Sequence, residues 1–168
     1  RHAVVDVRDP TGDGHWGARR HRGDDCRAGR GASLSGLCCD SSAIISFLVD
    51  SGPDGSWVAD TLAHSTLHAP ALLPFECGNI LRRHEAAGLI GTDQADQAYR
   101  DLADLPVELW PYDALAARIW ELRRNLTSYD AAYVALAEAI GVPLVTLDRR
   151  LARASGAACV MRTPDSVD

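Results

Sequence analysis

The strongest constraint on the fold is a helix-length run that leads directly into a buried strand. Residues 128–141 read SYDAAYVALAEAIG, which predicts a helix capped by Ser128 and ended by Gly141. Residues 142–147 read VPLVTL, an apolar and partly β-branched run that is typical of a strand covered on both faces. Strands separated by helices need crossover connections, which favour a parallel sheet with helices on its faces.

The same alternation of strand-like and helix-like runs extends over residues 37–163. Further strands are expected near residues 37–39, 107–110 and 159–163, the last at an edge of the sheet. Further helices are expected over residues 41–50, 54–66, 68–90, 92–105, 113–126 and 148–156. Pro70 and Pro74 mark the start of the third of these helices, Gly88 marks its end, and Thr92 caps the fourth. The pattern predicts an α/β protein: a three-layer α/β/α sandwich with a central, mainly parallel sheet.

Acidic residues stand at the ends of these predicted elements. A helix of about twelve residues after Asp130 spans ~18 Å, and a strand of about six residues returns ~20 Å. Asp148 is therefore expected level with Asp130, at the same end of the sheet. Asp40 follows the first strand, at the carboxyl end where open parallel sheets bind ligands. Glu76 falls in the first turn of its helix, after a connection that can bring it to the same end.

These four acids can converge, and their charges would then repel one another strongly in a partly dry cleft. A cation among them would relieve the repulsion, and oxygen ligands without His or Cys favour Mg²⁺ or Mn²⁺. Such a site can activate a water molecule and hold a phosphodiester for in-line attack. Each acid alone also fits a simpler role at a turn, a helix cap or a first helical turn. The functional prediction therefore rests on the set of four.

Composition narrows the class of protein. The formal net charge of -6 does not favour indiscriminate binding to nucleic acid. The five cysteines are odd in number and form no C-x-x-C pair, which argues against a zinc ribbon or a disulfide framework. We interpret them as reduced thiols of a cytoplasmic protein. No apolar run approaches ~18 residues, so the sequence predicts no membrane span.

Residues 1–36 differ from the rest of the chain. This segment holds half of the fourteen glycines and, apart from AVVDV, has no apolar periodicity. We expect a flexible or non-native N-terminal extension, followed by a folded domain over residues 37–168. The alternative is a basic arm for RNA, built on Arg19, Arg20 and Arg22.

Three sequence blocks resemble the PIN-domain ribonucleases, and among them the VapC toxins of bacterial type II toxin–antitoxin pairs. The blocks are LCCDSSAII, PALLPFECGNILRR and LTSYDAAYVALAEAIGVPLVTLDRRLARA, within residues 37 to about 160. The resemblance implies a metal-dependent endoribonuclease with an α/β/α fold. It implies Asp40 and Asp130 as the main ligands of Mg²⁺ or Mn²⁺, with Glu76 and Asp148 completing the catalytic cluster. A metal-activated water would then attack the phosphorus of RNA.

Other residues would support this chemistry. Ser42 matches a small hydroxyl common two residues after the first Asp of the family, and Asn79 lies one helical turn after Glu76. Arginines flank the acidic blocks and are candidates for contact with RNA phosphates or an acidic antitoxin tail; they are Arg82, Arg83, Arg149 and Arg150. The expected partners are RNA, a cognate antitoxin encoded nearby and a second copy of the chain. Solvated helix faces are the simpler explanation for the arginines.

Two other functions remain open at this point. The chain could be a catalytically silent PIN-like module that only binds a protein. It could also be a phosphohydrolase of the haloacid dehalogenase type, which likewise uses an Asp after the first strand. That chemistry requires a second Asp where Ser42 stands and a Lys, and the chain contains no Lys.

Overall fold

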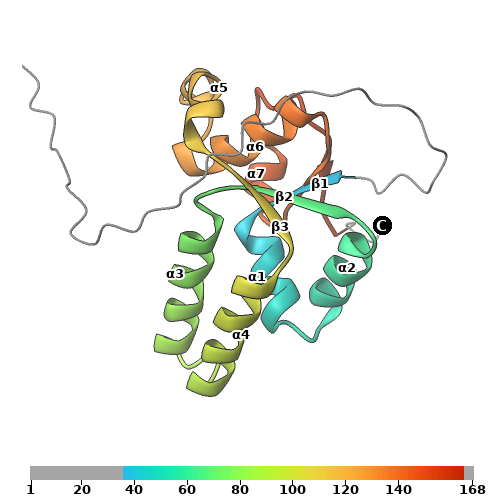
Figure 1. The fold of residues 1–168 in the computed structure, drawn as a ribbon. Helices are drawn as coiled ribbons and strands as arrows, with labels where there is room; N and C mark the ends of the chain where they lie inside the picture. Colours follow the sequence, from blue (N-terminus) through green and yellow to red (C-terminus); the bar gives the residue numbers. More distant parts are fainter. Residues whose placement is uncertain (1–35, 165–168) are drawn as a thin grey trace, which may run out of the picture. The chain divides into compact units, whose positions relative to one another are not determined.

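The computed structural model describes residues 36–164. The predicted N-terminal extension therefore lies, apart from Gly36, outside the described residues. Five strands form one sheet in the order β3-β2-β1-β4-β5, and every neighbouring pair is parallel (Figure 1). The strands are β1 (Gly36–Cys39), β2 (Thr66–Pro70), β3 (Val107–Trp110), β4 (Leu144–Val145) and β5 (Met161–Arg162). The predicted parallel sheet is confirmed.

Helices cover both faces of this sheet, as the α/β/α prediction requires. In Figure 1, α1 to α4 lie on one side of the strands and α5 to α7 on the other. The helices are α1 (Ser41–Val49), α2 (Pro53–Leu62), α3 (Leu73–Ala86), α4 (Thr92–Asp104), α5 (Ala116–Leu122), α6 (Ser128–Ile140) and α7 (Arg149–Ala152). A 3₁₀ turn, η1 (Tyr112–Ala114), precedes α5. Within the part described, no helix combines the length and apolar character needed to cross a membrane.

The predicted helix over residues 68–90 is wrong at its start. Its first residues belong to β2, which pairs with both β1 and β3, and the helix begins at Leu73. Within β2, Leu67 and Ala69 are buried in the core. Pro70 ends the strand, where a residue without an N–H interrupts the ladder least. Pro74, in contrast, occupies the first turn of α3 as predicted.

Two predicted caps shift by one residue, since Gly91 rather than Thr92 precedes α4 and Thr127 rather than Ser128 caps α6. Asp40 caps α1. Gly141 ends α6 as predicted, with φ 68° in the left-handed region that glycine tolerates without strain. The elements after it are shorter than predicted, since β4 has two residues and α7 has four.

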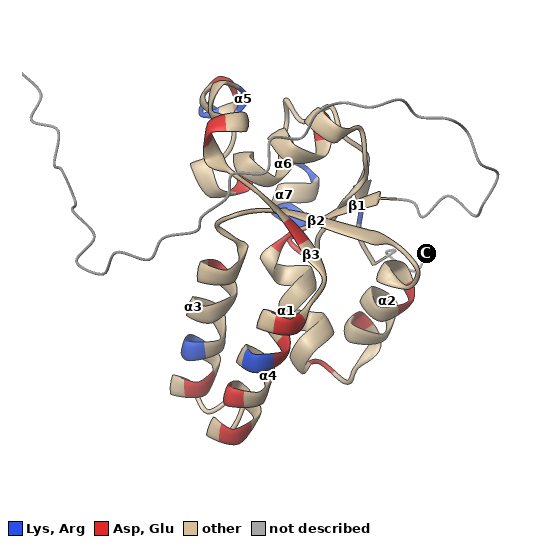
Figure 2. Cartoon of the chain, viewed as in Figure 1, with Lys and Arg blue, Asp and Glu red and all other residues tan. Residues whose placement is uncertain are grey.

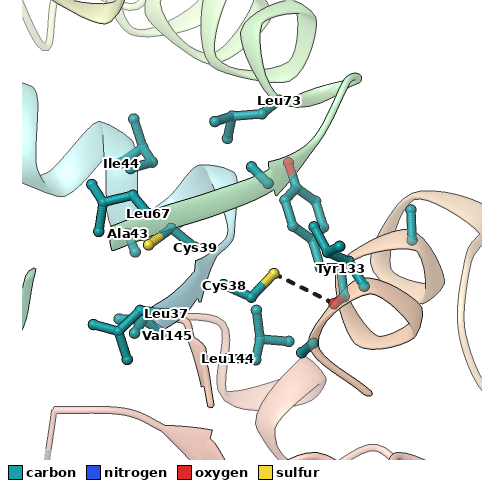
Figure 3. Packing of buried hydrophobic residues seen from close by; sticks show 14 of the residues in the cluster. Leu37, Cys38, Cys39, Ala43, Ile44, Leu67, Leu73, Tyr133, Leu144 and Val145 are labelled. Carbon is teal, nitrogen blue, oxygen red and sulfur yellow. Dashed lines mark hydrogen bonds between the residues drawn. The ribbon is translucent and has the colours of Figure 1, made fainter. Parts of the chain in front are cut away.

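The centre of the core is α6. Seven consecutive residues of this helix, from Ala131 to Ala137, are buried. Four of the seven are alanines, and small side chains let a helix approach a sheet closely. The thiol of Cys38 in β1 donates to the carbonyl of Tyr133 at 3.6 Å, as Figure 3 shows. The start of α6 is therefore held firmly against the central strand.

An ion-pair network ties α5 to the carboxyl end of α6. Arg118 donates from Nε to Oε2 of Glu138 at 2.7 Å and from Nη2 to Oε1 at 3.2 Å. The amide of Ala158 donates to the same Oε1 at 2.7 Å. The hydrogen bonds from Arg118 are the main reason that the pKa of Glu138 is lowered, and the Ala158 amide adds to them.

Replacing Glu138 by glutamine should lower the free energy of unfolding by about 1 kcal/mol near neutral pH. The loss is no larger because Arg118 is partly exposed, and solvent screens the ion pair. A lowered folded-state pKa gives stability that is fully present above the unfolded value, ~4.3. That stability disappears as the pH falls through the folded pKa. In urea unfolding from about pH 7 to about pH 3, the gap between wild type and Glu138→Gln should close in acid. A gap that stays constant, or an equal gap for the control Glu85→Gln, would contradict this role.

Candidate functional site

Asp40 lies at the carboxyl end of β1, where the chain turns into α1. Its side chain is 5% exposed. Oδ1 accepts hydrogen bonds from the amides of Ser42 and Ala43, and Oδ2 accepts one from the hydroxyl of Thr146. Burial raises the pKa of Asp40 despite these hydrogen bonds. A carboxylate is thus held in a fixed orientation in a place that disfavours its charge.

Glu76 lies in the first turn of α3, as predicted. Its Oε2 accepts a hydrogen bond of 2.6 Å from the hydroxyl of Tyr133, whose side chain extends from α6 towards the start of α3 (Figure 3). Desolvation is the largest cause that raises the pKa of Glu76, and the charges of Asp40 and Asp130 raise it further. Asp40 and Asp130 therefore both lie close enough to Glu76 for their charges to act on it.

Asp130 lies in the first turn of α6, and its orientation is set by the cap of that helix. The hydroxyl of Thr127 donates to Oδ2 of Asp130 at 2.8 Å, and the amide of Asp130 donates back to Thr127 at 3.2 Å. This reciprocal pairing satisfies one free amide of the first helical turn. It fixes the Asp130 side chain in the first turn of α6.

Asp148 occupies a different position from the other three acids. Its Oδ1 accepts from the amides of Arg150 and Leu151, which makes it the N-cap of α7. Its Oδ2 lies 3.6 Å from the guanidinium of Arg150. Its backbone is nevertheless close to Asp40, because the amide of Asp148 donates at 3.0 Å to the Thr146 hydroxyl that bonds Asp40. The carboxylate of Asp148 therefore serves the helix that follows it.

Thr146 joins these residues, and the sequence analysis does not single it out. Its side chain is fully buried. Its hydroxyl donates to Asp40, accepts from the amide of Asp148, and lies 3.5 Å from the hydroxyl of Ser42. Ser42 in turn accepts from the amide of Leu147 at 2.9 Å. The available signal is a polar residue in the apolar run VPLVTL, two positions before Asp148.

The predicted polar and basic contacts lie on the surface. Asn79 is exposed, and the hydrogen bonds found among residues 36–164 include none from its side chain. The four arginines proposed for RNA or antitoxin contact are exposed as well; they are Arg82, Arg83, Arg149 and Arg150. Figure 2 shows the basic segment of α3 further from the sheet than the acidic first turn of that helix. The prediction that these residues meet RNA or an antitoxin stays a prediction.

Three of the four acids lack an ion-pair partner in the described part of the chain. The four ion pairs found there include Asp148 but neither Asp40, Glu76 nor Asp130. Within the same part of the chain, no three His, Cys, Asp or Glu side chains form a closed metal cage. The donor set itself, carboxylate oxygens with unbalanced charge, has the chemistry that hard divalent cations prefer. By that criterion the residues present fit a metal of the Mg²⁺ or Mn²⁺ type.

Comparison with known proteins finds VapC proteins both by sequence and by structure. The PIN domain family matches residues 37–157. Ribonuclease VapC12 of Mycobacterium tuberculosis is 38% identical over 120 residues, which are 71% of this chain and 92% of that protein. The M. tuberculosis toxin VapC20, described as cleaving the sarcin-ricin loop, has a TM-score of 0.58 at 18% identity, over 76% of this chain and 99% of that one. VapBC2 of Rickettsia felis has a TM-score of 0.57 at 13% identity, over 77% and 99%.

Proposed function

Because the chain belongs to the PIN-domain family, among the VapC ribonucleases, we propose that it cleaves RNA as the toxin of a toxin–antitoxin pair, at the site formed by Asp40, Glu76 and Asp130. The observation that carries this site is the position of Glu76 near two further carboxylates, Asp40 and Asp130, whose charges raise the pKa of Glu76. Such an arrangement destabilises a protein unless a cation offsets it. A catalytically silent module that only binds a protein would not need such a cluster of carboxylates.

The VapC ribonucleases depend on a divalent metal, and Mg²⁺ or Mn²⁺ is our proposal for the ion in this chain. Asp40, Glu76 and Asp130 would hold it, and Asp148 would keep α7 in place beside them. When bound, such an ion lowers the pKa of a coordinated water and offsets charge on a phosphodiester. The contacts that orient these acids come from the chain itself: Thr146 and Ser42 orient Asp40, Tyr133 orients Glu76, and Thr127 orients Asp130.

The partners follow from this function. A toxin of this type has an antitoxin as its protein partner, and the R. felis relative is described as VapBC2 bound to promoter DNA. RNA is the proposed substrate, with Arg82, Arg83, Arg149 and Arg150 as candidate phosphate contacts. A homodimer is proposed as the assembled state. Asn79, exposed on α3 three residues after Glu76, is a further candidate for hydrogen bonding to RNA.

Adding Mn²⁺ should both stabilise the protein and switch on RNA cleavage. An ion that binds only the folded state at about 100 times its Kd stabilises that state by about 2.7 kcal/mol. The measurement is thermal unfolding, together with cleavage of an end-labelled unpaired RNA, each with Mn²⁺, with Mg²⁺ and with EDTA. We expect products with 5′-phosphate ends only when metal is present. Cleavage that survives EDTA would contradict the metal site. If metal changes neither the melting temperature nor the amount of RNA cleaved, the protein-binding module is favoured.

A further inference from the structure

An apolar cavity of about 250 Å³ lies between the ends of β2 and β3, α5 and the first turn of α6, the turn that also carries Asp130. We call it the aromatic pocket and define it by Leu72, Trp110, Tyr112, Ile119, Tyr129 and Ala132. Tyr112 and Tyr129 are 68% and 63% exposed, which is far more than a core aromatic side chain. Two tyrosine rings are therefore available to a ligand at the mouth of this cavity.

The lining of the aromatic pocket adjoins the helical turns that carry Glu76 and Asp130. Leu72, immediately before α3, precedes Glu76 by four residues, which is about one helical turn. On α6, Tyr129 and Ala132 lie on either side of Asp130 in the sequence. At ~100° per residue, Asp130 points away from the pocket by roughly a third of a turn. An RNA strand that passes over Asp130 and Glu76 can therefore place a neighbouring nucleotide in the pocket.

The chemistry of the lining suits a flat, uncharged ring. No charged side chain contributes to the walls, which are apolar and aromatic apart from hydroxyl groups and backbone. A phosphate would find no cation there. The volume lies below the ~300–1,000 Å³ typical of pockets for drug-sized ligands, so it suits one ring system. Aromatic faces bind bases by stacking, with little regard to their identity.

We propose that the aromatic pocket binds an unpaired base of the RNA substrate, from a nucleotide next to the cleaved phosphodiester. This inference rests on the proposed function and adds the class of substrate, which is RNA with a base free to leave its stack. A second protein copy is the competing occupant. A protein seated over Tyr112 and Tyr129 would cover the first turn of α6, which carries Asp130, so the base is the better match.

The test combines base removal from the RNA with ring removal from the protein. An unpaired oligonucleotide that the wild type cleaves with Mn²⁺ is resynthesised with one abasic ribose at each position around the cut. One position should lower kcat/KM by about 5- to 150-fold, the range expected for loss of one stacked base. In Tyr112→Ala and Tyr129→Ala, the intact RNA should show a similar loss, and the abasic RNA should show little further loss.

Matched variants separate stacking from folding and from assembly. Tyr112→Phe and Tyr129→Phe keep the rings and should recover most of the activity that the alanine variants lose. Tyr99→Ala, which removes an exposed tyrosine from α4, should cleave like the wild type. If the wild type cleaves RNA but no abasic position lowers kcat/KM, the proposal that the aromatic pocket binds a base is wrong, while the proposed ribonuclease activity is retained. If the wild type cleaves no RNA with Mn²⁺, the proposed function itself fails. If the alanine variants change the mass measured by sedimentation, the pocket is a protein interface and the proposal is overturned.

Discussion

Replacing Asp40 by asparagine should lower RNA cleavage by about 100-fold or more. The substitution keeps the size of the side chain and an oxygen that can accept from the amides of Ser42 and Ala43. It removes the negative charge that is needed to hold a divalent cation. Loss of one electrostatic partner in an active site typically lowers the rate by about 10²–10³-fold. The measurement is kcat/KM on an unpaired RNA with saturating Mn²⁺.

The same variant should be more stable than the wild type when metal is absent. Burial raises the pKa of Asp40, which means that the folded state disfavours its ionised form. At neutral pH a neutral amide avoids that penalty, so the melting temperature in EDTA should rise while activity falls. Asp96→Asn, at an exposed position on α4, should change neither property. Cleavage by Asp40→Asn within about threefold of the wild type would exclude Asp40 from the site.

Replacing Thr146 by valine should weaken both stability and cleavage. Valine has nearly the same shape but leaves the amide of Asp148 without its acceptor and Oδ2 of Asp40 without its donor. An unsatisfied buried polar group costs about 1–3 kcal/mol. Loss of a group that orients a metal ligand typically costs about 10–100-fold in affinity or activity. Urea unfolding and the Mn²⁺ dependence of cleavage measure the two effects.

Thr146 is a positioning residue, and the controls must separate that role from simple packing. Thr146→Ser keeps the hydroxyl and should retain most of the activity, even if the lost methyl group lowers stability. In Thr146→Val the Mn²⁺ concentration for half-maximal cleavage should rise, which a packing defect alone would not produce. In the Asp40→Asn background, Thr146→Val should have little further effect on cleavage, because coupled residues are not additive. Independent effects would contradict the link.

The parallel sheet could be predicted because it follows from the alternation of helices and strands. The run from Ser128 to Leu147 contains a helix followed by an apolar strand, and such a pair leaves few topologies. β2 was harder to identify, because its short apolar segment runs into Pro70, Ala71 and the start of α3 without a clear boundary. The two-residue period of Leu67 and Ala69 was its only signal.

The acids of the site could be predicted from their places at element ends, but the residues that hold them could not. Thr146 and Tyr133 are buried, and in the sequence they look like ordinary core positions. Thr146 lies about a hundred residues after Asp40 in the sequence, and Tyr133 about sixty residues after Glu76. The fold decides which buried hydroxyl donates to which carboxylate, because it packs these distant segments together. The position of Asp148 was ambiguous for the same reason, since a cap and a ligand share one sequence signal. The aromatic pocket draws on separate segments that only the fold brings together.

The burial of α6 on all sides has a consequence for how such a sequence can change over time. A helix with a solvent-facing side tolerates substitutions there without effect on the rest of the molecule. From Ala131 to Ala137 this helix has no such side. A change in that stretch therefore alters the packing of the sheet and the placement of Asp130 together. Substitutions in these few residues are therefore expected to affect the fold and the active site at the same time.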